Sequence, residues 1–404
     1  MLRSIEDYAD IVGEKVIADI YKKAHGLYNM HVSHVNSTFM GGGVAEILSR
    51  LVPFMNGVGI DTEWGIIHGN PAFFEVTKKF HNALQGGDIH LTEMKKNLYL
   101  NVNQEYAGYA HLNYRDCVFI HDPQPLPLIR FSRKRQPWIW RCHIDLSSPN
   151  KELWDFLKKY MLRYNLIIVS SEKFKKPSLP VEQRVIHPAI DPLSLKNREL
   201  SKQDIAKYIK KSGIPTDKPI IAQISRMDPW KDPEGVLEVF RIVKKKVDCR
   251  LLYCYNLATD DPEGMDIYAR VRKKAKDLIG NGDVIFVLGN NDILVNAIQR
   301  FCDVILQKSI KEGFSLTTTE ALWKGKPVVA GNVGGIPAQI KDGENGFLVE
   351  PDDYKKCADR VIEILKKPNL AKELGNKARE TVKNKFLITR LLSDYLDLLV
   401  EVLQ

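Results

Sequence analysis

The sequence predicts an α/β protein built from two doubly wound domains. Its 404 residues suggest two or three domains at about 150 residues each. Short apolar runs bounded by Gly, Asp, Asn or Pro alternate with amphipathic helical patterns in both halves, an order typical of parallel sheets covered by helices. Hydrophobic residues make up 44% of the chain, enough to fill ordinary globular cores, and this composition excludes a disordered protein.

The first half contains five candidate strands and three candidate helices. The strands are residues 30–35, 60–67, 117–121, 138–141 and 166–170, and the helices are residues 44–56, 70–84 and 151–164. A short strand-like piece at residues 184–187 is followed by Pro188, Pro192 and a polar run. We therefore expect the boundary within residues 188–202 and a first domain that spans residues 1–195.

The second half repeats the alternation more clearly. Its candidate strands are residues 219–224, 250–255, 284–288, 304–306, 327–330 and 346–349, and its candidate helices are residues 234–247, 265–278, 293–301 and 315–324. Three more helical patterns follow. The last ends with Leu398, Leu399, Val402 and Leu403 and is so apolar that it must pack on another part of the protein. The second domain is expected at residues 196–384.

Charge and cysteine content narrow the classes of partner. Lys and Arg (59) exceed Asp and Glu (50) in short scattered groups, which favours small anionic ligands over nucleic acid. No apolar run approaches about 18 residues, and Glu6 and Asp7 stand where a signal peptide needs an apolar stretch. We expect a cytoplasmic protein with no membrane partner.

The six cysteines include no C-x-x-C pair and indicate buried thiols.

Residues 311–322 follow a strand and open a helix, the place where doubly wound sheets bind ligands. Gly313 permits a close approach to the backbone. The N–H groups of Phe314, Ser315 and Leu316 would face an anion at the positive end of the helix. The segment therefore predicts a phosphate or pyrophosphate site.

Two carboxylates flank this helix start. Glu312 precedes the helix and Glu320 lies roughly two turns into it, so the pair could hold hydroxyl groups at either end of an elongated ligand. Two plainer interpretations stay open: Ser315 could be an ordinary helix N-cap, and both acids could be solvated surface groups.

Residues 224–234 form a second candidate loop between a strand and a helix. Arg226 could clamp a diphosphate with its planar fork, and Lys231 could do so as a point charge. A surface loop with incidental charges would have the same sequence pattern, so this loop by itself does not show that a diphosphate binds here.

A glycine turn at residues 41–43 follows the first strand. It does not match the dinucleotide fingerprint, because Glu46 stands where the last glycine of G-x-G-x-x-G is required, and it has no Walker lysine. A structural turn and a ligand loop that includes Gly42 and Gly43 fit it equally well.

All ten histidines lie at or before His187, so an imidazole needed for the reaction must come from the first domain. His143, at the end of a strand, is the best candidate, and His121, followed by Asp122, is the second. Such an imidazole would face a phosphate site across an interdomain cleft. A lone histidine is more often structural, so this alternative also stays open.

Together these motifs resemble the retaining glycosyltransferases of the two-domain GT-B fold, a large family that includes sucrose synthase and bacterial-type glycogen synthases. The motifs that carry the resemblance are the E-x7-E spacing of Glu312 and Glu320, the pair Arg226 and Lys231, the glycine turn, and residues 325–330 and 345–349. The resemblance implies two facing Rossmann-like domains, the first for the acceptor and the second for the nucleotide sugar. It also implies a terminal helix at residues 385–404 that crosses back onto the first domain.

The resemblance also implies roles for individual residues. Glu320 would bind the nucleotide ribose, Glu312 would approach the donor sugar, and Arg226 and Lys231 would hold the diphosphate. The catalytic candidates are Glu312, His143, Arg226 and Lys231; the donor-binding candidates are Glu320, Gly313, Phe314, Ser315, Leu316, Gly42 and Gly43; the acceptor-binding candidates are Glu46, His121 and Asp122.

Residues 35–46, 119–125 and 140–145 are similar to one branch of that family, the trehalose glycosyltransferring synthases and trehalose phosphorylases. This implies transfer of glucose from UDP-, ADP- or GDP-glucose to free glucose, giving α,α-trehalose, by front-face attack with the leaving diphosphate as base. We expect no tightly bound cofactor, Mg²⁺ as an activator with no identified ligand residue, and a homodimer as the default association.

Four alternatives remain. A phosphorylase would use phosphate in place of the nucleotide, and Glu320 argues against it because a ribose-binding carboxylate has no use without a nucleotide. Another retaining GT-B glucosyltransferase, such as a sucrose-synthase-like enzyme, would share the motifs. A GT-B epimerase would need acid/base carboxylates at the sugar ring, and a sugar-nucleotide-binding protein would show no turnover.

Overall fold

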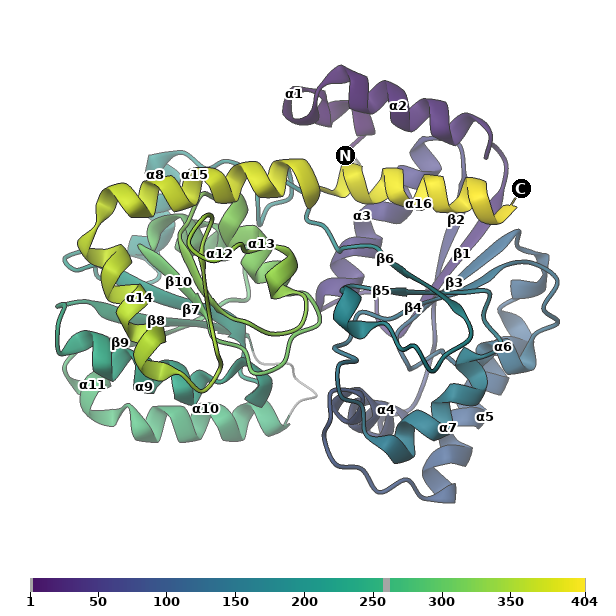
Figure 1. Ribbon diagram of the computed structural model, residues 1–404, viewed down its shortest axis with the longest axis horizontal. Coiled ribbons are helices and arrows are strands. Elements are labelled where there is room, and N and C mark those ends of the chain that lie inside the picture. The colour runs from purple at the N-terminus through teal and green to yellow at the C-terminus, as the bar shows by residue number, and fades with distance from the viewer. Residues whose placement is uncertain (1–2, 257–261, 404) are drawn as a thin grey trace. The chain divides into compact units, whose positions relative to one another are not determined.

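The computed structural model describes residues 3–256 and 262–403. The chain divides into two compact units: unit 1 comprises Met1–Ala189 and Leu387–Gln404, and unit 2 comprises Ile190–Phe386. Each unit has its own parallel six-stranded sheet with helices packed on it (Figure 1). The predicted doubly wound α/β fold is confirmed, while the acceptor and donor roles of the domains stay a prediction.

The sheet of unit 1 has the strand order β2-β1-β3-β4-β5-β6. Its strands are β1 (His31–Asn36), β2 (Asp61–Ile66), β3 (Cys117–His121), β4 (Trp138–Arg141), β5 (Leu166–Val169) and β6 (Glu182–Val185). Strands β3 and β4 are buried along their whole length, as expected for parallel strands covered on both faces. The chain runs in opposite directions across the sheet from β1 and from β3, so their carboxyl ends mark the switch point where such sheets bind ligands.

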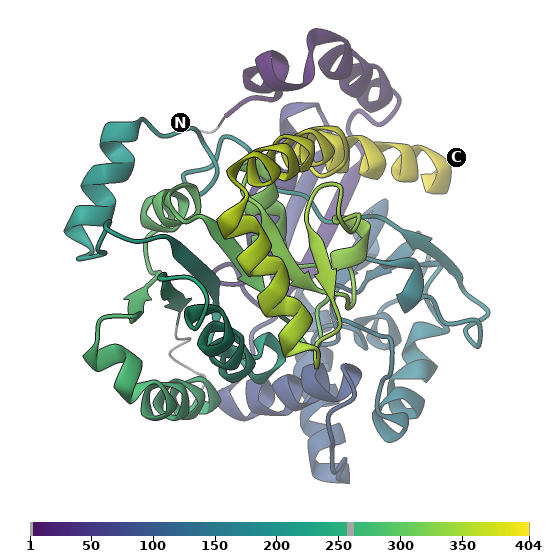
Figure 2. The ribbon, with the colours of Figure 1, turned by 60° about the vertical axis from the view of Figure 1, so that its left-hand side comes forward.

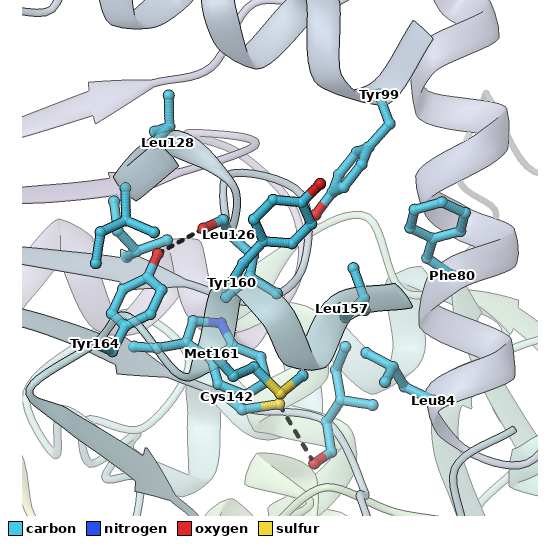
Figure 3. Packing of buried hydrophobic residues seen from close by; sticks show 14 of the residues in the cluster. Phe80, Leu84, Tyr99, Leu126, Leu128, Cys142, Leu157, Tyr160, Met161 and Tyr164 are labelled. Carbon is cyan, nitrogen blue, oxygen red and sulfur yellow. Dashed lines mark hydrogen bonds between the residues drawn. The ribbon is translucent and has the colours of Figure 1, made fainter. Parts of the chain in front are cut away.

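The helices of unit 1 cover a core rich in aromatic residues. They are α1 (Ala9–Val12), α2 (Glu14–His25), α3 (Gly43–Gly57), α4 (Pro71–Leu84), α5 (Glu93–Tyr109), α6 (Leu128–Phe131) and α7 (Lys151–Met161). Figure 3 shows part of this core, where the hydroxyl of Tyr164 donates a hydrogen bond of 2.7 Å to the Leu126 carbonyl. All six cysteines of the chain are buried and free, which confirms the interpretation of buried thiols.

The sheet of unit 2 has the order β12-β11-β10-β7-β8-β9. Its strands are β7 (Ile220–Arg226), β8 (Arg250–Asn256), β9 (Val284–Leu288), β10 (Val304–Gln307), β11 (Val328–Gly331) and β12 (Phe347–Val349). Its helices are α8 (Lys202–Lys211), α9 (Pro233–Lys244), α10 (Pro262–Lys274), α11 (Lys276–Gly280), α12 (Asp292–Phe301), α13 (Leu316–Trp323), α14 (Tyr354–Lys366) and α15 (Pro368–Lys385). Here the switch point lies between β7 and β10.

One predicted helix of unit 2 is wrong in its extent. The single helix expected at residues 265–278 is two helices, α10 and α11, separated at Ala275. The φ and ψ of Ala275 are −93° and 10°, outside the helical region, so the chain turns there although the apolar pattern continues.

The last helix, α16 (Ile388–Leu403), belongs to unit 1 although it follows the last helix of unit 2. It lies beside α2, as both views show, and it also contacts α3 (Figures 1 and 2). Leu392, Tyr395, Leu396 and Leu399 are buried there, which satisfies the apolar pattern and confirms that the terminal helix packs on the first domain. Among the described residues, no helix is long and apolar enough to cross a membrane.

Candidate functional site

In unit 2, residues 312–316 connect β10 to α13 at the switch point. Ser315 has a φ of 73°, in the left-handed region, and the helix begins at Leu316. The Ser315 side chain makes no capping hydrogen bond, and its Oγ lies 2.8 Å from Thr318 Oγ1. Ser315 therefore occupies the N-cap position of α13, as the plainer interpretation has it, but its side chain does not cap the helix. The first N–H groups of an α-helix have no acceptor within the helix, so the start of α13 is suited to an anion.

The side chain of Gln339 holds the backbone of this segment in place by hydrogen bonds. Its Nε2 donates to the Phe314 carbonyl, and its Oε1 accepts a bond of 2.7 Å from Thr319 Oγ1. Gly335 packs directly against the segment, since a Cβ there would lie 2.6 Å from the Gly313 carbonyl oxygen. The close approach of a ligand to the Gly313 backbone stays a prediction.

Lys231 and Glu312 meet at the switch point. Lys231 ends the short helix η4 (Pro229–Lys231) after β7, and its Nζ donates a hydrogen bond to Glu312 Oε2. The side chains are 21% and 11% exposed, so the ion pair is largely shielded from water. Ser309 Oγ lies 3.4 Å from the same carboxylate oxygen. Lys231 and Glu312, two of the three catalytic candidates of unit 2, therefore neutralise one another in this structure.

Two buried side chains that the sequence analysis missed hold the Lys231 loop. Gln223 Nε2 donates to the Lys231 carbonyl at 2.7 Å, and Lys308 Nζ donates to the carboxylate of Asp232. Lys308 is fully buried, with its Nζ 4.2 Å from the Tyr354 ring centroid. A polar residue in an otherwise apolar strand, as at Gln223, is the signal that could have pointed to this role.

Arg226 lies at the end of β7 and points toward its own loop. Its Nη2 is 3.1 Å from Asp228 Oδ2, and its side chain is 52% exposed. Within the part of the chain that the structure describes, no hydrogen bond or ion pair joins Arg226 to Lys231 or Glu312. The structure therefore places both cations after the same strand but brings only Lys231 to the carboxylate.

Glu320 lies in α13 with a side chain that is only 4% exposed. Gln299 Nε2 donates to its Oε2 at 3.0 Å, and Lys196 Nζ lies 3.7 Å from its Oε1. These partners exclude the alternative of a solvated surface acid. Gln299 and Lys196 were both missed; Gln299 could have been noticed as a polar residue among the apolar positions of α12.

In unit 1, the glycine turn follows β1 and leads into α3. Gly41 and Gly42 have φ of 75° and 82°, which a residue with a side chain rarely adopts. Beyond the adjoining residues, no atom of the described chain lies within 4 Å of where a Cβ of either would stand, and both glycines are exposed to solvent. Gly43 is the first residue of α3, and the N–H of Glu46 donates to the Gly42 carbonyl at 3.3 Å.

His121, Asp122 and His143 gather at the carboxyl ends of β3 and β4. The backbone N–H of His143 donates to Asp122 Oδ1 at 2.7 Å, and Asp122 has a φ of 62°. Burial raises the pKa of Asp122 to about 7 and lowers the pKa values of His121 and His143 well below the usual histidine range. Both imidazoles are therefore neutral at physiological pH.

The sequence analysis missed two buried residues beside this group. His34 on β1 has its Nδ1 3.0 Å from His121 Nε2, and Arg141 at the end of β4 is 1% exposed. Burial lowers the pKa of the Arg141 guanidinium, whose positive charge in turn helps to lower the pKa values of both predicted histidines. An arginine between Trp140 and Cys142 in a buried strand was the available signal.

Two family models match the chain. "Trehalose synthase, N-terminal domain" matches residues 34–176, and "Glycosyl transferases group 1" matches residues 204–381. A trehalose synthase of Pyrococcus horikoshii is 46% identical over 400 residues, which cover 98% of this chain and 96% of that protein. The chain belongs to the trehalose synthase family. The predicted recognition and the class of enzyme, a hexosyl-transferring glycosyltransferase, are thereby confirmed.

Other members and relatives of the trehalose synthase family agree with this assignment. The trehalose synthase of Rubrobacter xylanophilus is 40% identical over 99% of this chain and 97% of its own length. A trehalose phosphorylase of Pleurotus pulmonarius is 28% identical over 95% of this chain, which spans 59% of the phosphorylase.

Solved structures establish the fold. A sucrose-phosphate synthase from Thermosynechococcus elongatus superposes with a TM-score of 0.74 at 17% identity, covering 92% of this chain and 99% of that one. A UDP-forming α,α-trehalose-phosphate synthase from Burkholderia vietnamiensis gives a TM-score of 0.73 at 14% identity, covering 92% and 97%. These neighbours confirm the GT-B fold class that the sequence motifs implied.

Proposed function

We propose that this chain transfers glucose from a nucleoside diphosphate glucose to the anomeric hydroxyl of free glucose, giving α,α-trehalose with retention of configuration. The observation that carries the proposal is the pairing of Lys231 with Glu312 beside the start of α13. A cation, a carboxylate and a helix N-terminus together suit a ligand with an anionic diphosphate and a hydroxylated sugar. The trehalose synthases at 40% and 46% identity support the product.

The chemistry proposed needs no carboxylate nucleophile. The bond between the sugar C1 and the diphosphate oxygen breaks as the acceptor oxygen bonds to C1 from the same face, and the acceptor proton passes to the departing diphosphate. Lys231 would leave Glu312 to donate to this diphosphate, and Glu312 would then be released toward the donor sugar. Arg226 and the start of α13 would donate to the growing negative charge.

No step of this proposal depends on a metal held by the protein. Among the residues described, no group of three or more His, Cys, Asp or Glu side chains could hold a metal ion. Mg²⁺ usually keeps several waters and binds through one or two carboxylates and substrate phosphates, so an activating Mg²⁺ would be held mainly by the diphosphate oxygens and water.

The experiment that tests the function is product identification. The protein is incubated with UDP-, ADP- or GDP-glucose and a panel of acceptors, and the product and its anomeric configuration are determined by NMR. We expect α,α-trehalose with glucose as acceptor. A different disaccharide would indicate another retaining glucosyltransferase, and an epimerised nucleotide sugar or no turnover would contradict the proposal.

A phosphorylase is the second candidate, because trehalose phosphorylases are among the relatives. Trehalose is incubated with inorganic phosphate alone and with a nucleoside diphosphate alone. Breakdown that requires the nucleoside diphosphate is expected; breakdown with phosphate, releasing glucose 1-phosphate, would replace the proposed donor.

Glu320→Gln is expected to raise the KM for the nucleotide sugar about 10- to 100-fold, because a buried carboxylate that accepts from ribose hydroxyls is worth about 1.5–3 kcal/mol. Glu344→Gln, at a glutamate in the same unit whose side chain is 52% exposed, is the matched control. Steady-state kinetics measure the effect. A KM equal to that of the control would remove Glu320 from the donor site.

Gly335→Ala is expected to raise the same KM about tenfold, because the new Cβ would push the 312–316 segment through the Gly313 carbonyl, an overpacking that costs about 1–3 kcal/mol. Gly280→Ala is the control, since no atom of the described residues outside its own helix turn lies within 4 Å of its Cβ position. If both variants bind the nucleotide sugar as the parent does, the position of this segment does not matter for donor binding.

His143→Ala is expected to lower kcat about tenfold, the value of one neutral hydrogen bond to the reacting sugars. Initial rates at saturating donor and acceptor measure the change. Intact transferase activity would remove His143 from the catalytic candidates and leave it a structural residue.

A further inference from the structure

Three histidines of unit 1 form one hydrogen-bonded row. His34 lies on β1, His121 ends β3, and His143 follows β4, so the row crosses three adjacent parallel strands (Figure 1). Nδ1 of His34 is 3.0 Å from Nε2 of His121, and Nδ1 of His121 is 3.0 Å from Nε2 of His143. Each hydrogen bond joins the Nδ1 of one ring to the Nε2 of the next, so the three rings are connected head to tail.

The two ends of the row differ. His34 is fully buried between the ring of Phe119, 4.6 Å away between centroids, and Tyr395 of α16, 5.9 Å away. Its Nε2 has no hydrogen-bond partner among the residues that the structure describes. His143 is only half-buried, and its Nδ1 takes part in no hydrogen bond within residues 3–256 and 262–403. Nδ1 of His143 is therefore the one ring nitrogen of the row that can meet a ligand.

The row restricts where protons can be. A neutral imidazole has one N–H donor and one acceptor nitrogen, so two head-to-tail hydrogen bonds allow only two arrangements of neutral rings. Either all three rings carry the proton on Nδ1, or all three carry it on Nε2. Burial lowers the pKa values of the three rings, that of His34 to about 3, which keeps them neutral.

The buried end decides between the two arrangements. With protons on Nε2, His34 would bury an N–H group without an acceptor; with protons on Nδ1, it would bury only an unpaired acceptor. Buried N–H groups without an acceptor are the rarer and more costly case in proteins. The arrangement with every proton on Nδ1 is therefore favoured.

We propose that His34 and His121 are positioning residues that fix His143 as the neutral Nδ1–H tautomer, so that it presents a hydrogen-bond donor to a sugar oxygen. The ligand part of this inference rests on the proposed function, but the tautomer does not. A histidine without the row could present either a donor or a bare acceptor to the sugar. The row of hydrogen bonds leaves only the donor form, because its buried end, His34, lies in the core beneath α16.

The tautomers can be read directly. The full chain is labelled with ¹⁵N-histidine, and long-range ¹H–¹⁵N spectra distinguish Nδ1–H, Nε2–H and doubly protonated rings. Substitution of each histidine in turn assigns the signals. We expect all three rings of the row to be neutral Nδ1–H tautomers near pH 7. A proton on Nε2 of His143, or a charged ring there, would overturn the proposal without any activity measurement.

His34→Phe tests transmission along the row. Phenylalanine keeps the stack on Phe119 and removes only the nitrogen atoms, so the His143 signal is expected to shift toward the Nε2–H form. His25→Phe is the matched control, since His25 also stacks on an aromatic ring, Tyr28, at 5.2 Å, and lies outside the row. An unchanged His143 signal in a folded His34→Phe protein would overturn the role of His34.

Kinetics separate this inference from the proposed function. His34→Phe is expected to lower kcat about tenfold with little change in the KM of the nucleotide sugar, because only one neutral hydrogen bond to the sugar is lost. An Nδ1–H tautomer at His143 in a protein with no transferase activity would support the row and contradict the function. A normal kcat in a His34→Phe protein whose His143 tautomer has shifted would contradict a hydrogen bond from His143 Nδ1–H to the substrate.

Discussion

Replacement of Lys231 by alanine is expected to lower kcat for trehalose formation by about 100- to 1,000-fold. Lys231 is held beside the start of α13 by its bond to Glu312 and by the Gln223 bond to its carbonyl. A departing diphosphate gains negative charge in the transition state. A preorganised donor at such a position is worth about 2.7–4 kcal/mol of transition-state stabilisation. Initial rates at saturating donor and acceptor measure the effect.

Arg226→Ala is expected to lower kcat strongly as well, because its guanidinium follows the same strand. Lys218→Ala provides a matched control, since Lys218 is a partly exposed lysine of the same unit that pairs with Asp248 at 2.9 Å. Circular dichroism establishes that each variant is folded. Near-normal turnover in both Lys231→Ala and Arg226→Ala would overturn the assignment of the diphosphate site.

Unit 1 is expected to lose stability steeply as the pH falls below about 6.5. The folded pKa values of His34, His121 and His143 lie below the unfolded value of 6.5, that of His34 at about 3. Below about pH 6.5 the three histidines bind protons in the unfolded chain but stay neutral in the folded protein. Their contribution to the free energy of unfolding is therefore fully present above this pH and falls below it. Each histidine contributes a slope of up to roughly 1.4 kcal/mol per pH unit.

Asp122 acts in the opposite direction. Its folded pKa of about 7 lies above the usual aspartate value of 3.8, so the folded protein holds a proton that the unfolded chain releases between these values. Its contribution to stability therefore grows as the pH falls through this window. Three histidines outweigh one aspartic acid, and the net slope is expected to be destabilising toward acid.

Urea unfolding at a series of pH values, followed by the fluorescence of the buried Trp138 and Trp140, measures this slope. His34→Phe is expected to make the slope shallower, because one group that refuses a proton is gone. Asp122→Asn is expected to make it steeper, because the opposing group is gone. Equal slopes in both variants and in the parent would contradict the burial of these groups as the cause.

Most strands and helices could be predicted from the sequence because each leaves a local pattern. Strands β3 and β4 have the predicted ends, since each is a short apolar run that closes on one polar residue, His121 or Arg141. Helix α5 could not be predicted in this way. It buries Tyr99, Asn103 and Tyr106, so its inner face carries polar groups and shows no apolar stripe.

The candidate site was predicted as separate motifs and not as contacts. The sequence by itself determined that Lys231, Glu312, His121 and His143 end or follow strands. Because these strands are parallel, the residues of each unit lie at the carboxyl edge of its own sheet. Only the tertiary structure decided that Lys231 bonds Glu312 across 81 residues, because β10 pairs with β7. Strand order depends on how whole helices pack over a sheet, and no single segment carries that information.

The row of histidines shows the same limit most clearly. Nothing near His34 in the sequence distinguishes it from a core residue of β1. The pairing of β1 with β3, which sets His34 opposite Phe119 and brings its ring to His121, gives it a role. The local sequence thus determines which chemical groups are present and at which strand ends they lie. The pairing of strands distant in the sequence determines which of these groups form hydrogen bonds with one another.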